Sequence, residues 1–240
     1  MSSSETNQKQ APSTLSKISP TVYVITMNQK LIDLPLILSI NEHLDTLDEV
    51  KGPMSLITTS SNEKVYNTGF DLKIFAQPKH EVQSFLMLFN KLLSRFLQLG
   101  YPTLACLNGH CYAGGLMFAM THDFRFKSSD KGNVCMNEVD IGVPFAPGLI
   151  TVYFQKLTPD ALRRLIVFGE VFTPEKALEA GIVDKIQVSD KLLETSKEFL
   201  ETVAPKSRHR IILADIKRVL YEKAIHAAET KFLPDPGMMK

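Results

Sequence analysis

The order of its secondary-structure signals is what most constrains the fold of this 240-residue chain. Short β-branched or apolar runs, at 21–27, 54–59 and 103–107, read as strands. Helical patterns lie between them, and the clearest spans 80–99 with one apolar face and Gly100 after it. Beyond Gly148 the patterns are helical. This order predicts an α/β core followed by an α-helical C-terminal part.

The boundaries follow from the same patterns. Residues 1–18 are mostly polar and are expected to form a flexible tail. Residues 19–190 are expected to form the core, and 191–240 a C-terminal helical region that includes one long helix over about 207–231. Thr158-Pro159 and Thr173-Pro174 each predict a helix start, since threonine caps a helix and proline suits its first position.

Charge and composition exclude several function classes. The chain has 27 basic and 26 acidic residues, a balance that gives no electrostatic footprint for nucleic acid. No apolar run reaches the roughly 18–20 residues of a membrane span. Three cysteines without close pairing favour buried thiols over a disulfide framework or a zinc site, so no metal is expected.

Two glycine-containing junctions are candidates for chemistry. The first is Thr68-Gly69-Phe70-Asp71, and the second is the segment 109–115, Gly-His-Cys-Tyr-Ala-Gly-Gly. Glycine at such a turn lets the backbone approach a ligand, and two amides from separate turns can form an oxyanion hole. On composition alone, ordinary tight turns are the favoured interpretation of both segments, since short glycine motifs often occur without such a function.

Four segments in this order resemble the crotonase (enoyl-CoA hydratase/isomerase) family. They are 68–72 (Thr-Gly-Phe-Asp-Leu), 109–115 followed by Asp123, 137–142 (Asn-Glu-Val-Asp-Ile-Gly) and 172–184, with its Ala-Leu-x-x-Gly-Ile-Val-Asp pattern. The resemblance covers roughly residues 20–232 and is closest to isomerases of the peroxisomal or plant type. It implies a ββα superhelix core and C-terminal helices that build trimers or hexamers.

The resemblance also assigns roles to single residues. The backbone N–H groups of Phe70 and Gly114 would hold the thioester oxygen, and Glu138 would be the acid/base. Met117 stands where the hydratase branch carries its first glutamate. One carboxylate can move a proton from one carbon to another but cannot readily split a positioned water, so the pattern favours a Δ3-Δ2-enoyl-CoA isomerase in β-oxidation of unsaturated fatty acids.

Other residues near these motifs leave alternatives open. Asp71 and Tyr112 are candidates for turn support or the acyl pocket, and Met117 for that pocket. The alternative roles for Glu138 are a surface carboxylate or a helix N-cap partner. For Asp140 and His110, structural roles are favoured over catalytic ones. Four methionines could line a fatty-acyl pocket or fill the core: Met87, Met117, Met120 and Met136. Five basic residues near the C-terminus could contact CoA phosphates or lie on a solvated helix face: Lys206, Arg208, Arg210, Lys217 and Arg218.

The resemblance leaves rival functions. The chain could catalyse another reaction of the family, hydration or thioester hydrolysis, or serve as a non-catalytic scaffold or assembly subunit that retains the fold. The expected substrate is an acyl-CoA thioester, with CoA as part of the substrate and no separate cofactor. The expected compartment is the peroxisome or the mitochondrial matrix, although neither a presequence nor a Ser-Lys-Leu ending marks it.

Overall fold

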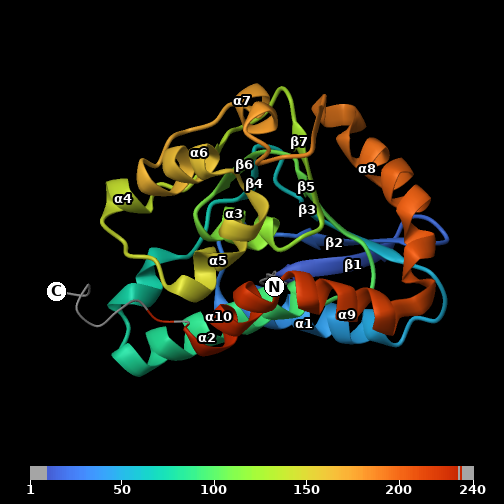
Figure 1. Cartoon of the computed structure of the whole chain (residues 1–240), viewed down its shortest axis with the longest axis horizontal. Coiled ribbons are helices and arrows are strands. Elements are labelled where there is room, and N and C mark those ends of the chain that lie inside the picture. The colour runs from blue at the N-terminus through green and yellow to red at the C-terminus, as the bar shows by residue number, and fades with distance from the viewer. Residues whose placement is uncertain (1–9, 232, 234–240) are drawn as a thin grey trace, which may run out of the picture.

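Two β-sheets of unequal size organise the molecule. The computed structural model describes residues 10–231 and 233. Its larger sheet has the order β1-β2-β3-β5-β7-β9, and its smaller sheet has the order β4-β6-β8 (Figure 1). All neighbouring strands are parallel except β1 and β2. The strand bounds are Ser13–Lys17 (β1), Val22–Met27 (β2), Ser55–Ser60 (β3), Val65–Asn67 (β4), Thr103–Leu107 (β5), His110–Tyr112 (β6), Phe124–Ser128 (β7), Val134–Cys135 (β8) and Lys185–Gln187 (β9).

A β-β-α unit repeats along the core. In each unit the first strand joins the larger sheet, the second joins the smaller one, and a helix follows. The first two units are β3-β4-α2 and β5-β6-α3, with α2 at Lys79–Leu97 and α3 at Gly114–Met120; in the third, β7-β8 lead to α4 (Glu138–Ile141) and α5 (Pro147–Lys156). This arrangement confirms the predicted ββα core.

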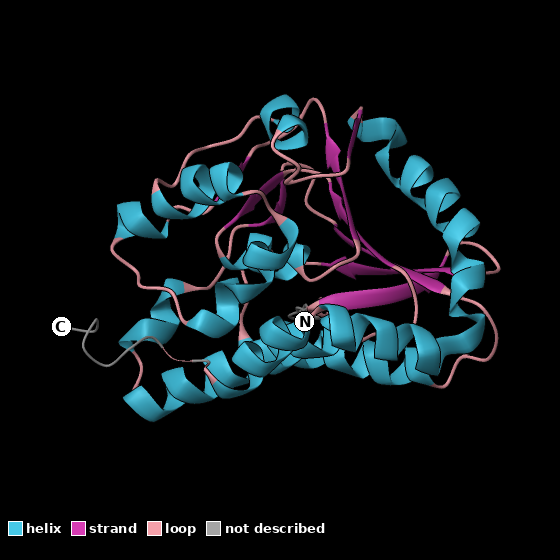
Figure 2. Ribbon diagram, in the orientation of Figure 1, coloured by secondary structure: helices cyan, strands magenta, loops and turns pink. Residues whose placement is uncertain are grey.

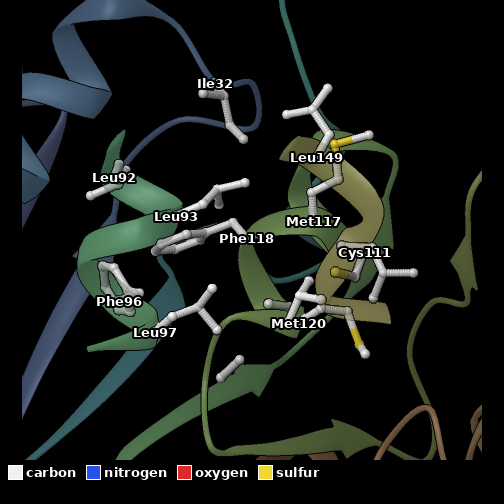
Figure 3. Packing of buried hydrophobic residues seen from close by; sticks show 14 of the residues in the cluster. Ile32, Leu92, Leu93, Phe96, Leu97, Cys111, Met117, Phe118, Met120 and Leu149 are labelled. Carbon is white, nitrogen blue, oxygen red and sulfur yellow. The ribbon is translucent and has the colours of Figure 1, made fainter. Parts of the chain in front are cut away.

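Helix α2 packs its apolar face into the core between α1 (Leu34–Asp48) and α3. Leu92, Leu93, Phe96 and Leu97 are buried, and Figure 3 shows Leu93 and Leu97 on the side of α2 that faces Phe118. The Phe96 and Phe118 rings meet edge to face with centroids 4.7 Å apart. Aromatic and aliphatic burial of this kind supplies most of the driving force for folding, so α2 fixes α3 and the turn before it.

The C-terminal part is helical, as predicted, and consists of α8 (Ser189–Val203), η3 (Ala204–His209), α9 (Arg210–Leu220) and α10 (Glu222–Thr230) (Figure 2). The single long helix predicted over 207–231 is wrong. Tyr221, with φ −105° and ψ 17°, separates α9 from α10. The break lets α10 lie against α5 and α2, where Ala224, Ala227 and Ala228 are buried.

The remaining short elements connect β8 to α8. They are α6 (Pro159–Leu162), the π-helical η2 (Arg163–Val167) and α7 (Pro174–Glu179), while η1 (Leu72–Ala76) precedes α2. Thr158 and Thr173 cap α6 and α7 through side-chain oxygens that accept from Ala161 N and Lys176 N, so both predicted helix starts are confirmed. No helix within 10–231 is long and apolar enough to span a bilayer.

The predicted flexible tail over 1–18 is wrong for its second half. Residues 13–17 form β1, an edge strand that pairs with β2 along its whole length, and residues 1–9 lie outside the described residues. The run is polar because Thr14, Ser16 and Lys17 face solvent, while Leu15 packs on the core. Backbone hydrogen bonds and one apolar contact hold such a strand, and composition alone does not reveal them.

Candidate active site

One cavity gathers both glycine junctions and Glu138. Its volume is about 760 Å³, and it lies where β4, β6 and β8 lead into η1, α3 and α4. Phe70, Gly114, Met117 and Glu138 all line it. The rest of the apolar lining comprises Leu31, Leu72, Phe75, Val82, Leu86, Ala113, Ile141, Val143, Pro144, Phe145, Leu149 and Leu233. A mainly apolar pocket with few polar groups is typical of a small-molecule site.

The first junction leaves the Phe70 amide without an acceptor among the described residues. Ile32 N donates to Gly69 O (2.7 Å) and Ile32 O accepts from Asp71 N (3.3 Å). Neighbouring residues of an extended chain point their amides to opposite sides. The Phe70 N–H therefore faces away from Ile32, and it has no acceptor among residues 10–231.

The second junction leaves the Gly114 amide free in the same way. Ala113 precedes α3 with φ 48° and ψ −126°, the one non-glycine residue with positive φ in the described part of the chain. Leu116 N and Met117 N both donate to Ala113 O, while Gly114 N has no acceptor within the described residues. A strained backbone of this kind costs on the order of 1–3 kcal/mol and is concentrated at functional sites.

The two junctions touch each other. A Cβ atom added to Gly69, which has φ 94°, would lie 2.9 Å from Gly114 N. A Cβ added to Gly114 would lie 3.1 Å from Cε1 of Phe70. Glycine is therefore required at both positions for the backbones to meet. Two free amides on adjoining turns that line one cavity are the arrangement from which an oxyanion hole is built.

Glu138 brings a carboxyl group to this cavity. It is the first residue of α4 and is only 4% exposed. Its Oε2 atom has no hydrogen-bond partner among the described residues. Burial raises the pKa of Glu138 to about 7, against an ordinary value of 4.5. A carboxyl group with this pKa can both accept and return a proton near neutral pH.

The positions of the other predicted residues differ. Met117 is buried and lines the cavity beside Leu149 of α5 (Figure 3). Asp71 caps η1 by accepting from Lys73 N (3.0 Å), and Tyr112 packs against His110; neither is among the residues that line the cavity. Met117 is also the one cavity-lining residue of the four methionines.

Two further residues, His110 and Asp140, lie outside the lining of the cavity. His110 Nδ1 lies 3.2 Å from the Asn133 amide that it accepts from, and burial lowers its pKa. Asp140 is exposed and does not line the cavity. The described residues contain no cluster of three or more His, Cys, Asp or Glu that could hold a metal.

The basic residues near the C-terminus do not line the cavity. Lys217, expected on a solvated helix face, is instead buried and donates to Asp123 Oδ2 (2.6 Å) and to Tyr101 O (2.9 Å). The sequence interpretation missed Lys79 and Asn137, which do line the cavity. Asn137 directly precedes Glu138, so its place in the motif was the signal that could have found it.

Comparison with known proteins agrees with this geometry. The family described as Enoyl-CoA hydratase/isomerase matches residues 17–236. The chain belongs to this family. It is 32% identical over 174 residues to Enoyl-CoA delta isomerase 3 of Arabidopsis thaliana, which covers 70% of this chain and 73% of that protein. It is 30% identical over 196 residues to the same plant's "Enoyl-CoA delta isomerase 2, peroxisomal", with 77% and 81% covered.

A solved structure supports the fold. An enoyl-CoA hydratase of Mycobacterium ulcerans superimposes with a TM-score of 0.82 at 24% identity, and the match covers 92% of this chain and 96% of that one. At this identity the likeness shows the crotonase fold alone. This chain is therefore a member of an enzyme family that acts on enoyl-CoA thioesters.

Proposed function

We propose that this protein is a Δ3-Δ2-enoyl-CoA isomerase that moves a 3-enoyl double bond to the 2-trans position during β-oxidation of unsaturated fatty acids. One observation carries the proposal. Glu138 is the one carboxylate among the described residues that line the cavity, and its carboxyl group is buried beside two adjoining turns with free amides. The two plant relatives bear the name enoyl-CoA delta isomerase, which supports the same reaction.

In the proposed reaction Glu138 first acts as the base. Its ionised carboxylate takes a proton from C2 of the 3-enoyl-CoA, and the electron pair of the broken C–H bond moves toward the thioester carbonyl. The resulting dienolate oxygen accepts hydrogen bonds from the Phe70 and Gly114 amides. Two amides fixed by folding stabilise this charge without reorganising, which is why such a group of donors lowers the barrier.

The second step returns the proton. Protonated Glu138 donates to C4, the C2=C3 double bond forms, and the carboxylate is restored. Hydrogen moves within the substrate and no electrons leave it, so the proposed reaction needs no redox partner, and CoA enters as part of the substrate. Because one group gives back what it took, a pKa near neutral suits both steps.

The lining of the cavity is less suited to hydration. Adding water across C2=C3 requires one group to take a proton from water and another to deliver a proton to C2. Met117 lines the cavity at the position where the hydratase branch of the family carries its first glutamate, and a thioether neither donates nor removes a proton. This residue favours isomerisation over hydration.

The direct test incubates the purified full-length chain with 3-hexenoyl-CoA and follows the absorbance of the conjugated enoyl product. We expect that absorbance to appear, to persist, and to be lost in Glu138→Gln. Loss of absorbance from 2-hexenoyl-CoA without any isomerisation would identify a hydratase. Release of free CoA thiol would identify a thioester hydrolase. Full cellular function of Glu138→Gln would support the scaffold alternative.

We also propose a homo-oligomer, a trimer or a hexamer. Helix α9 leaves an apolar face uncovered in the single chain: Ile211 is 77% exposed and Val219 is 78% exposed, with Ile212, Ile216 and Leu220 beside them. Apolar patches of this kind usually mark an interface. Sedimentation of the wild type should show a trimer or hexamer, and Val219→Glu should shift it toward the monomer; a monomeric wild type would contradict the proposal.

For the compartment we propose the peroxisome, with the mitochondrial matrix as the alternative. The support is that one plant relative is named peroxisomal. Imaging of the tagged chain beside markers for both organelles tests this, and a cytosolic distribution would contradict it.

A further inference from the structure

Asn67 links the two junctions that carry the free amides. It is the last residue of β4 and is fully buried, and it pairs across the smaller sheet with Cys111 of β6. Its Oδ1 atom accepts from Gly69 N at 2.8 Å, inside the first junction. Asn67 therefore holds the backbone that immediately precedes Phe70.

The same residue also supports the second junction. A Cβ atom added to Gly115 would lie 2.3 Å from Asn67 O and 2.9 Å from Asn67 Cβ. The backbone of Gly115, one residue after Gly114, thus rests directly on Asn67. One buried residue is hydrogen-bonded to the turn of one amide and packed against the turn of the other.

The chemistry of Asn67 argues against a purely structural role. Its Nδ2 atom is buried and has no hydrogen-bond partner among residues 10–231. An unpaired buried N–H group costs about 1–3 kcal/mol, which a smaller residue would avoid. Within the side-chain amide of Asn67, only the oxygen has a hydrogen-bond partner, and that partner is Gly69 N–H. The side chain therefore acts mainly on the geometry of the first turn.

We propose that Asn67 is a positioning residue that fixes the separation of the Phe70 and Gly114 amides. It thereby sets how tightly these amides bind the dienolate oxygen. This inference rests on the proposed function, in which those amides stabilise the dienolate oxygen. Asn67→Ala removes the acceptor of Gly69 N–H and lets the first turn relax. Small displacements of groups that act on the transition state lower kcat strongly, whereas substrate binding through the rest of the cavity is retained.

The experiment measures kcat and KM for 3-hexenoyl-CoA together with the binding of 3-oxohexanoyl-CoA, whose bound enolate absorbs in the near ultraviolet. For Asn67→Ala we expect kcat to fall about 10- to 100-fold and KM to change less than about threefold. Enolate affinity should fall in parallel with kcat. Asn67→Ser, whose hydroxyl oxygen is an acceptor of shorter reach, should recover part of both.

The matched control is Asn90→Ala. Asn90 is also fully buried and also has one unpaired polar atom, but it lies on α2 against Gly148 of α5. We expect this variant to lose stability while its kcat and enolate affinity stay near wild type. Parallel losses of kcat and enolate affinity in Asn90→Ala would show a general effect of buried asparagines and would overturn the proposal.

Equal enolate affinity in the wild type and Asn67→Ala would overturn the positioning role. The same holds if neither protein binds the enolate. If Asn67→Ala does not fold, wild-type kcat and enolate affinity in Asn67→Ser would overturn it instead. A wild type that binds the enolate but does not isomerise 3-hexenoyl-CoA would contradict the proposed function alone. In that case weaker enolate binding by Asn67→Ala would still support the positioning role.

Discussion

Two regions of the protein bury ionisable side chains, and only one of them supplies partners of opposite charge. At the start of β7, Asp123 pairs with Lys217 (2.6 Å) and Arg125 with Asp184 (3.0 Å), and Asp123 Oδ2 also accepts from Thr103 N (2.8 Å). At the cavity, Glu138 is 4% exposed and thus more deeply buried than Asp123 and Asp184, but its Oε2 has no partner within the described residues. An isolated buried carboxyl group holds its proton to higher pH than a solvated one, because burial disfavours the charged form.

This difference separates a structural site from a reactive one. The ion pairs join β7 to α9 and to the segment before β9, so they hold the C-terminal helices on the core. No such partner fixes the protonation state of Glu138, whose pKa lies at about 7. A group that must take a proton and return it needs this freedom.

The largest expected effect comes from removing the unpaired charge. Glu138→Gln keeps the size of the side chain but cannot accept a proton. Loss of a general base costs about 100- to 10,000-fold. We expect kcat for 3-hexenoyl-CoA to fall about 1000-fold with KM little changed. Retention of more than about a tenth of the activity would mean that another group is the base.

Breaking a paired charge should instead act on stability. Lys217→Met leaves the half-buried Asp123 without its cation, and removing one partner of a fully buried ion pair costs about 3–5 kcal/mol. We expect the free energy of unfolding in urea to fall by about 3 kcal/mol. Because the pair lies away from the cavity, kcat of the folded fraction should be unchanged.

The double variant Asp123→Asn/Lys217→Met provides the control for that prediction. It removes both charges and should recover part of the lost stability, since no uncompensated charge remains. Additive losses in the double variant would show that the two side chains do not interact.

An effect that depends on pH is expected on the stability of Glu138→Gln. The folded-state pKa of about 7 lies above the ordinary 4.5, so the contribution of Glu138 to stability is complete below about pH 4.5 and is lost as the pH rises through 7. At pH 9 the Gln variant should therefore be more stable than wild type, by on the order of 3 kcal/mol. At pH 4 the two should be equal, and a stability difference independent of pH would contradict the raised pKa.

The sequence was sufficient for the order of most elements and for several of the residues at the cavity. Apolar periodicity located α2, and motif order located Phe70, Gly114 and Glu138 on one cavity. It did not reveal β1, whose polar residues depend on backbone pairing, or the burial of Lys217 against Asp123. It also missed Asn67, because a hydrogen bond to Gly69 N and a contact with Gly115 depend on three-dimensional proximity.

The most direct test of the contrast between the two regions is an infrared titration of the carboxyl groups. The difference between wild-type and Glu138→Gln spectra isolates the stretching band of the protonated Glu138 carboxyl group. We predict that this band disappears with a midpoint near pH 7. A midpoint at the ordinary value of about 4.5 would show that Glu138 is solvated or paired, and it would contradict the proposed acid/base role.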